Sequence, residues 1–171
     1  MLRSLIPHPE STGEAVTAIE VDITRPAPRQ LVLRYYVTGD TAAIRLPATR
    51  APERADDLWE HTCFEAFLAN APGYLEFNFS PSTRWAAWRF DAYREGMRNA
   101  AITPPRIETL IGFDRFELRA ELAMPVLGPM GLSAVIEEKN GNRSWWALAH
   151  PSGEPDFHHE ACFALELPPA N

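Results

Sequence analysis

The sequence predicts an all-β protein built as a two-sheet antiparallel β-sandwich. Short segments in which apolar and polar residues alternate recur along the chain, separated by Pro, Gly, Asp and Asn. The 171 residues include 16 prolines and 9 glycines, which suit turns and sheet edges better than a helical bundle. This length fits a single domain over residues 1–171, in which we expect an irregular N-terminal arm over residues 1–14.

Several segments show the alternation of a strand. In chain order they are Val16–Asp22, Leu31–Val37, Ala42–Leu46, His61–Leu68, Tyr74–Ser80, Arg115–Met124, Leu132–Glu138, Ser144–Ala149 and Cys162–Leu167. In the fifth of these, Leu75 and Phe77 share one face of the strand, whereas Glu76 and Asn78 share the other. The segment Trp85–Arg94 also permits a helix because of its alanines and aromatic spacing, and we favour a strand there.

The connections between these segments carry turn signals. Asn140-Gly141 predicts a tight hairpin, since type I′ turns need positive φ at both central residues. Gly112-Phe113-Asp114 predicts another short connection, and Pro47–Asp57 predicts an exposed loop. Pro168-Pro169 is expected to end the last strand.

The charge balance restricts the class of partner. The chain has 23 acidic and 16 basic residues, a formal charge of -7 and a pI near 5.2. Such a chain is unsuited to nucleic acid or to an anionic membrane surface, whereas a neutral ligand is compatible with it. No apolar run reaches the ~20 residues of a membrane span, and Pro7 and Pro9 interrupt the short N-terminal one. We therefore expect a cytoplasmic protein.

The two cysteines predict buried thiols. Cys63 and Cys162 form no CxxC motif, and each lies beside a Phe in an apolar run. A free Cys in such a run behaves as a small hydrophobe. We expect both to be reduced, with a disulfide as the alternative.

Catalytic motifs are absent from the sequence, which contains no GxSxG, HExxH or phosphate-binding glycine loop. His158 and His159 are neighbours whose side chains would point to opposite faces of an extended segment, which disfavours a shared metal. Glu65 and Glu76 could meet across adjacent strands as a glycosidase pair does, although polar groups on a non-core face are the simpler interpretation. We expect a protein that is not an enzyme.

The tryptophans suggest a different kind of site. Trp85 and Trp88 have opposite parity on a strand, as do Trp145 and Trp146, so at most one of each pair can face the core. Trp59 follows a charged loop and precedes polar residues, which predicts a partly exposed ring. An exposed indole near carboxylates and amides is a good platform for stacking a sugar ring.

Four segments together resemble family 9 carbohydrate-binding modules and DOMON-like domains. They are Leu58–Leu68, Tyr74–Pro81, Leu118–Pro125 and Phe157–Leu165. The resemblance implies a β-sandwich of jelly-roll type that holds a small saccharide or polyol without catalysis, and we expect this chain to be a free-standing bacterial protein. It also implies the ligand-binding residues, namely Trp59 as a stacking wall, Glu65, Glu76 and Asn78 as hydroxyl partners, Glu137 as a polar contact, and Phe157 with His158 near a second aromatic wall.

The chain departs from the family in two respects. The binding modules have a Trp on the last loop, whereas this chain has none after Trp146, so Phe157, Trp146 or an imidazole would have to replace it. On one straight strand, Trp59 and Glu65 would lie about 20 Å apart, so Trp59 must sit on a segment folded back over the sheet.

Cofactors enter only as alternatives. Some DOMON-like domains bind haem through a Met and a His, which here would require His158 with one of Met97, Met124 and Met130. Calcium could use the acidic residues Asp56, Asp57 and Asp91, but their spacing lacks a calcium-loop signature. We expect neither cofactor.

Overall fold

The computed structural model describes residues 1–126 and 128–167, which form β-strands joined by turns and loops. Within those ranges there are twelve strands, two short 3₁₀ helices and no α-helix. The strands are β1 (Leu2–Pro7), β2 (Val16–Ala27), β3 (Gln30–Gly39), β4 (Cys63–Ala69), β5 (Tyr74–Phe79), β6 (Trp85–Phe90), β7 (Arg98–Asn99), β8 (Arg106–Ile111), β9 (Arg115–Leu122), β10 (Pro129–Glu137), β11 (Arg143–Ala147) and β12 (Leu165–Glu166). The 3₁₀ helices are η1 (Leu58–Glu60) and η2 (Glu160–Cys162). No helix in the described ranges is long and apolar enough to span a membrane.

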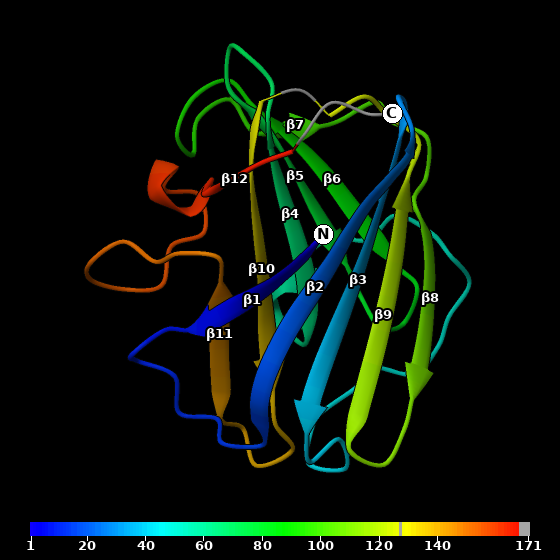
Figure 1. The fold of residues 1–171 in the computed structure, drawn as a ribbon, viewed down its shortest axis with the longest axis vertical. Coiled ribbons are helices and arrows are strands. Elements are labelled where there is room, and N and C mark those ends of the chain that lie inside the picture. The colour runs from blue at the N-terminus through cyan, green and yellow to red at the C-terminus, as the bar shows by residue number, and fades with distance from the viewer. Residues whose placement is uncertain (127, 168–171) are drawn as a thin grey trace.

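The strands of the described chain belong to one antiparallel, strongly curled sheet (Figure 1). Its order is β7-β6-β5-β4-β10-β11-β1-β2-β3-β9-β8, and β12 pairs with β10 beside this path. β1 links the two halves of the sheet, because Leu2 and Leu5 pair with β2 whereas Ile6 and Pro7 pair with β11. The predicted all-β antiparallel class is therefore confirmed, but hydrogen bonding does not divide the strands into two separate sheets.

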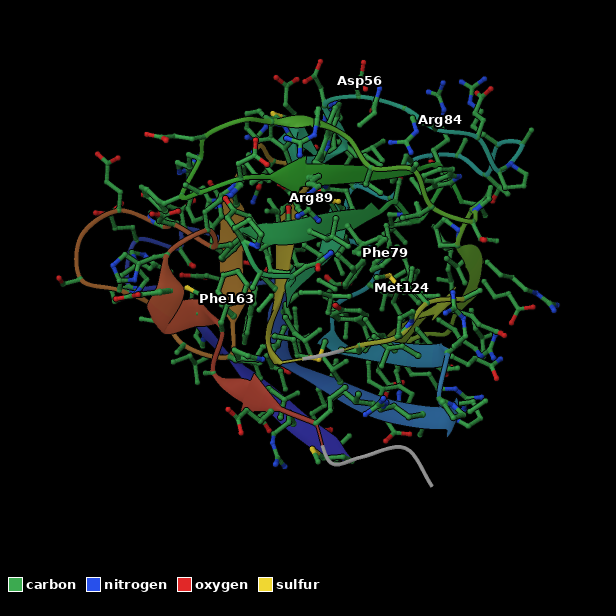
Figure 2. The ribbon with its side chains drawn as sticks, turned by 90° about the horizontal axis from the view of Figure 1, so that it is seen from above. Asp56, Phe79, Arg84, Arg89, Met124 and Phe163 are labelled. Carbon is green, nitrogen blue, oxygen red and sulfur yellow. The ribbon has the colours of Figure 1, made fainter. Side chains whose placement is uncertain are left out.

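The main core lies between the two halves of the curled sheet, which face one another (Figure 2). Leu33 and Tyr35 of β3 belong to the same buried cluster as Phe64 of β4 and Phe77 of β5. The rings of Tyr35 and Phe64 lie 5.0 Å apart across this core. The side chain of Phe79 is also fully buried in this cluster. Contact between the two halves therefore gives each strand one apolar face.

The alternation along each strand accounts for these faces. On β9, Phe116 and Leu118 belong to the core, whereas Arg119 and Glu121, further along the strand, form an ion pair at 2.8 Å on the other side. On β5, Leu75, Phe77 and Phe79 likewise point into the core. Burial of one face fixes the register, because a one-residue shift would turn every apolar side chain outward.

A second face is formed by the opposite side of β4, β5, β6, β10 and β11. It carries Glu65, Glu76, Trp88, Val135 and Trp145. Residues 148–163 cross part of this face, and their Phe157 packs in a second apolar cluster with residues of the strands. Figure 1 shows this C-terminal segment, in orange and red, beside β10 and β11. The functional site lies where the covering is incomplete.

Several strand predictions need correction. The expected irregular arm over residues 1–14 contains β1, and β7 and β8 are strands that the alternation did not reveal. Ala42–Leu46 is a turn in which only Ile44 makes an isolated bridge, to Glu138. The expected strand Cys162–Leu167 is the end of η2 followed by the two-residue β12. The short alternations at Ala42–Leu46 and Cys162–Leu167 were therefore misleading, whereas β7, of two residues, is too short to show any alternation.

The other local predictions are confirmed or refined. Trp85–Arg94 begins with a strand, β6, and continues into a turn. Asn140-Gly141 does connect a hairpin, between β10 and β11, but only Gly141 takes a positive φ, so the turn is not type I′. Gly112-Phe113-Asp114 joins β8 to β9, and Pro47–Asp57 is a loop. The prediction for Pro168-Pro169 lies outside the described residues.

Candidate functional site

A pocket of about 590 Å³ opens on the second face of the sheet. Its lining comes from β4, β5, β6, β10, β11, η1 and three loops. The lining residues are Asp57, Trp59, Glu65, Glu76, Trp88, Phe90, Arg94, Met97, Val135, Arg143, Trp145, Pro155, Phe157 and His158. Segments that are far apart in the sequence therefore build one site.

Two carboxyl groups come to the pocket from neighbouring strands. Glu65 on β4 pairs with Asn78 on β5, and Phe67 pairs with Glu76, so the two glutamates are diagonal neighbours on one face. Diagonal pairs have Cβ atoms roughly 7 Å apart, within reach of long side chains. Ser133 on β10 donates its hydroxyl to Oε2 of Glu65 at 3.1 Å, and Asn78 donates Nδ2 to Oε1 of Glu76 at 2.7 Å.

Both carboxyl groups are deeply buried, with Glu65 3% and Glu76 6% exposed. Burial, followed by the charge of Glu76, raises the pKa of Glu65 to about 8, although the hydroxyl of Ser133 opposes the shift. Burial also raises the pKa of Glu76, while the Asn78 amide and the charge of Arg94 lower it. Glu65 is consequently a protonated acid near neutral pH, able to donate as well as accept a hydrogen bond.

His158 forms one wall of the pocket. The hydroxyl of Tyr74 lies 2.7 Å from its Nδ1 and accepts a hydrogen bond from the backbone N–H of Arg94 at 3.2 Å. Burial, with the charge of Arg94, lowers the pKa of His158 to about 4, against the opposing effect of Asp156. The imidazole is therefore neutral, and either Nδ1 or the Tyr74 hydroxyl can be the donor of the hydrogen bond between them. Nε2 of the same ring lies 3.7 Å from Oε2 of Glu76.

Aromatic rings surround the carboxyl groups. Trp59 is 53% exposed on η1, which packs against β4 and β5, so the requirement that this residue fold back over the sheet is met. Asp57, at φ 56°, adopts a left-handed conformation immediately before η1. Trp88 on β6 and Trp145 on β11 line the same pocket. The other member of each pair, Trp85 or Trp146, belongs to the main core, as strand parity requires.

Five of the seven predicted ligand-binding residues line this pocket, namely Trp59, Glu65, Glu76, Phe157 and His158. Asn78 does not line it: this residue is 1% exposed and lies beside Glu76 on the same face of β5, where it donates a hydrogen bond to the Glu76 carboxyl group. Glu137 does not line it either. Its carboxylate oxygens instead lie 2.8 Å from His61 Nδ1 and 3.7 Å from Arg45 Nε.

The sequence did not assign Trp88, Trp145 or Arg94 to the site. The parity of the tryptophans left one of each pair free to face away from the core, which is a signal that could have found Trp88 and Trp145. Strand order supplies the missing step, because β6 and β11 flank β5, β4 and β10. Arg94 lies in a turn at φ 55° and pairs with Asp156 at 2.8 Å, and neither feature has a sequence signature.

Haem would need His158 and a Met as iron ligands. Nδ1 of His158 is hydrogen-bonded to the Tyr74 hydroxyl, and its Nε2, the nitrogen left for iron, lies 3.7 Å from Oε2 of Glu76. Met97 lines the same pocket, whereas Met130 is fully buried in the main core. Among the described residues no group of three or more His, Cys, Asp or Glu side chains could hold a metal ion. Cys63 and Cys162 are free and buried.

Comparisons with family models, with curated proteins and with solved structures give no match to this chain. The resemblance to carbohydrate-binding modules therefore remains a prediction. Function has to be inferred from the pocket itself, in which buried carboxyl groups, a neutral imidazole and several indole rings face one space.

Proposed function

We propose that this protein is a non-catalytic binding module that holds a small saccharide or polyol in the pocket on the second face. One observation carries the proposal: the partly exposed Trp59 lines the same pocket as the buried carboxyl groups of Glu65 and Glu76. Sugars combine apolar C–H faces with hydroxyl groups. A pocket that offers aromatic rings beside a few fixed polar groups matches both features.

The polar groups supply complementary hydrogen bonds. Protonated Glu65 can donate and accept, Glu76 can accept, and Nε2 of the neutral His158 can donate or accept according to its tautomer. Ser133, Asn78 and Tyr74 hold these three groups in place by hydrogen bonds of 2.7–3.1 Å. Because the polar groups are fixed before binding, little side-chain entropy is lost when the ligand arrives.

The fold supports the same proposal. We infer that the two facing halves of the curled sheet correspond to the two layers of a jelly-roll sandwich, as in the family that the motifs resemble. In this arrangement Phe157 and Trp145 take the part of the second aromatic wall, in place of the Trp of the last loop that the chain lacks. A cytoplasmic location, with no nucleic-acid or membrane partner, completes the proposal.

Isothermal titration calorimetry against a panel of mono- and disaccharides tests the proposal. We expect saturable binding by the wild-type protein and at least a tenfold loss of affinity in Trp59→Ala, because truncation removes a stacking wall. Phe113→Ala is the matched control, since Phe113 is an exposed aromatic, 96% accessible, in the β8–β9 connection. This control should bind like the wild type.

Two results would overturn the proposal. Absence of binding heat for the whole panel, by a protein whose circular dichroism is that of a folded β protein, would remove the binding function. Release of smaller sugars from a disaccharide would instead show that Glu65 and Glu76 act as a catalytic acid and base, and would overturn the non-catalytic part.

A further inference from the structure

The carboxyl group of Glu65 is buried without a cationic partner among the described residues. Its Oε2 accepts a hydrogen bond from Ser133, and its Oε1 has no hydrogen-bond partner in the same part of the chain. Burial and the charge of Glu76 raise the pKa of this carboxyl group, the Ser133 hydroxyl lowers it, and no cation contributes. A buried carboxyl group left this way at a pocket is suited to a ligand that brings a positive charge.

We propose that the preferred ligand of the pocket is an amino sugar, whose ammonium group binds between Glu65 and Glu76. This inference rests on the proposed saccharide-binding function and specifies the substrate class of the same site. It follows from the surroundings of the two carboxyl groups, which differ from those of the other buried glutamates on this part of the sheet.

Glu137 provides the internal comparison. It is also buried, on the same strand β10 that carries Ser133, and the protein gives it two basic partners, His61 and Arg45. Glu138 is buried as well, and its carboxylate accepts hydrogen bonds from the Ala15 backbone and the Asn140 amide. Glu65 and Glu76, by contrast, line the open pocket and have no cationic partner in direct contact among the described residues.

The charges around the pocket leave this space available to a cation. Arg94 faces Glu76, but its guanidinium is bound to Asp156 at 2.8 Å. Arg143 and Asp57 also line the pocket, with opposite charges. His158 is neutral because burial lowers its pKa to about 4. Two carboxyl groups thus remain that no cation of the described chain neutralises by direct contact.

The aromatic walls favour the same ligand. An ammonium group is attracted to the face of an aromatic ring, most strongly to the indole of Trp. Trp59, Trp88 and Trp145 line the pocket around the carboxyl groups. The sugar ring can stack on an indole while its ammonium group reaches the carboxyl pair, whereas a neutral sugar stacks in the same way but offers the pair only uncharged hydroxyl groups.

Binding of an ammonium group should be accompanied by proton release. Glu65 is protonated near neutral pH, because its pKa is raised to about 8. A cation placed beside it stabilises the carboxylate, so the proton moves from the Glu65 carboxyl group to solvent as the ion pair forms. A neutral sugar brings no charge and should leave the proton in place.

Matched ligand pairs test the inference by calorimetry. Glucose, galactose and mannose are compared with their 2-amino and N-acetyl-2-amino derivatives, at about pH 6.5, where amines of this kind are protonated. We expect at least one amino sugar to bind tenfold more tightly than both its parent and its neutral N-acetyl derivative. Repeating the titration in two buffers of different ionisation enthalpy should reveal proton release for the amino sugar alone.

Variants locate the effect. Glu65→Gln keeps the size of the side chain but removes the charge, so the ratio of amino-sugar to neutral-sugar affinity should fall towards one. Glu137→Gln, a buried glutamate outside the pocket, is the matched control and should keep the wild-type ratio. Binding of a neutral sugar with no preference for its amine would overturn this inference and leave the proposed function standing. Absence of binding by every sugar would overturn both.

Discussion

Replacement of Glu65 by Gln should stabilise the protein near neutral pH. Glu65 is 3% exposed, and its carboxyl group contacts the Ser133 hydroxyl but no cation of the described residues. The Tyr35 hydroxyl donates to the backbone oxygen of Glu65 at 2.7 Å from the opposite half of the sheet, which holds the residue in place. Gln has nearly the same shape and can still accept the Ser133 hydrogen bond, but it carries no titratable proton.

The size of the effect follows from proton linkage. The pKa of Glu65 is about 8 in the folded chain against 4.5 for an unperturbed glutamate, so the folded state binds the proton more tightly. Stability from this group is therefore fully present below the lower pKa and is lost as pH rises towards the higher one. Relative to a pH below the lower pKa, the free energy of unfolding falls by about 3 kcal/mol near pH 7 and by about 1 kcal/mol near pH 5.

Urea unfolding of both proteins at these two pH values measures the prediction. The stability of Glu65→Gln relative to the wild type should increase by about 2 kcal/mol from pH 5 to pH 7. A gain of about 3 kcal/mol at pH 7 corresponds to a rise in Tm of roughly 6–12 °C for a chain of this size. A difference between the two proteins that does not change with pH would refute the assigned protonation state of Glu65.

Two further predictions concern the interior. Phe77→Ala should lower the free energy of unfolding by ~3–5 kcal/mol, because this fully buried ring fills the main core, and a loss below ~1 kcal/mol in urea unfolding would contradict its placement. Cys63 and Cys162 should resist a thiol reagent in the native protein and both react after denaturation, since burial raises the pKa of both thiols, that of Cys162 to about 11. Rapid labelling of the native protein would show that a thiol is accessible.

The site depends on an asymmetry between the two faces of half the sheet. One face of β4 and β5 is covered completely by the opposite half, which forms the main core. The other face is covered only in part by the segment that carries Phe157 and His158. Polar residues could therefore be placed on this second face and still be shielded from bulk water, which is the condition that raises the pKa of both glutamates.

The order of residues was enough to predict the class of the fold and the face on which each strand residue lies. Alternation has a period of two, so the order of residues alone separates Leu75 and Phe77 from Glu76 and Asn78. The same rule separates Trp85 from Trp88 and Trp145 from Trp146. It also required Trp59 to fold back if it was to reach Glu65, because the straight-strand separation was too long.

Which of these residues meet depends on how the strands pair. The position of a residue along a strand predicts the face on which its side chain lies, but not which side chains lie next to it. The pairing of β4 with both β5 and β10 brings Ser133 to Glu65 and leaves Glu137 with His61. It also left Asn78 buried, hydrogen-bonded to Glu76, and outside the pocket lining. Strand order, the path of the C-terminal segment and the burial of each carboxyl group arise from contacts between distant parts of the chain. Local patterns report only on neighbours in the sequence, so they could not supply this information.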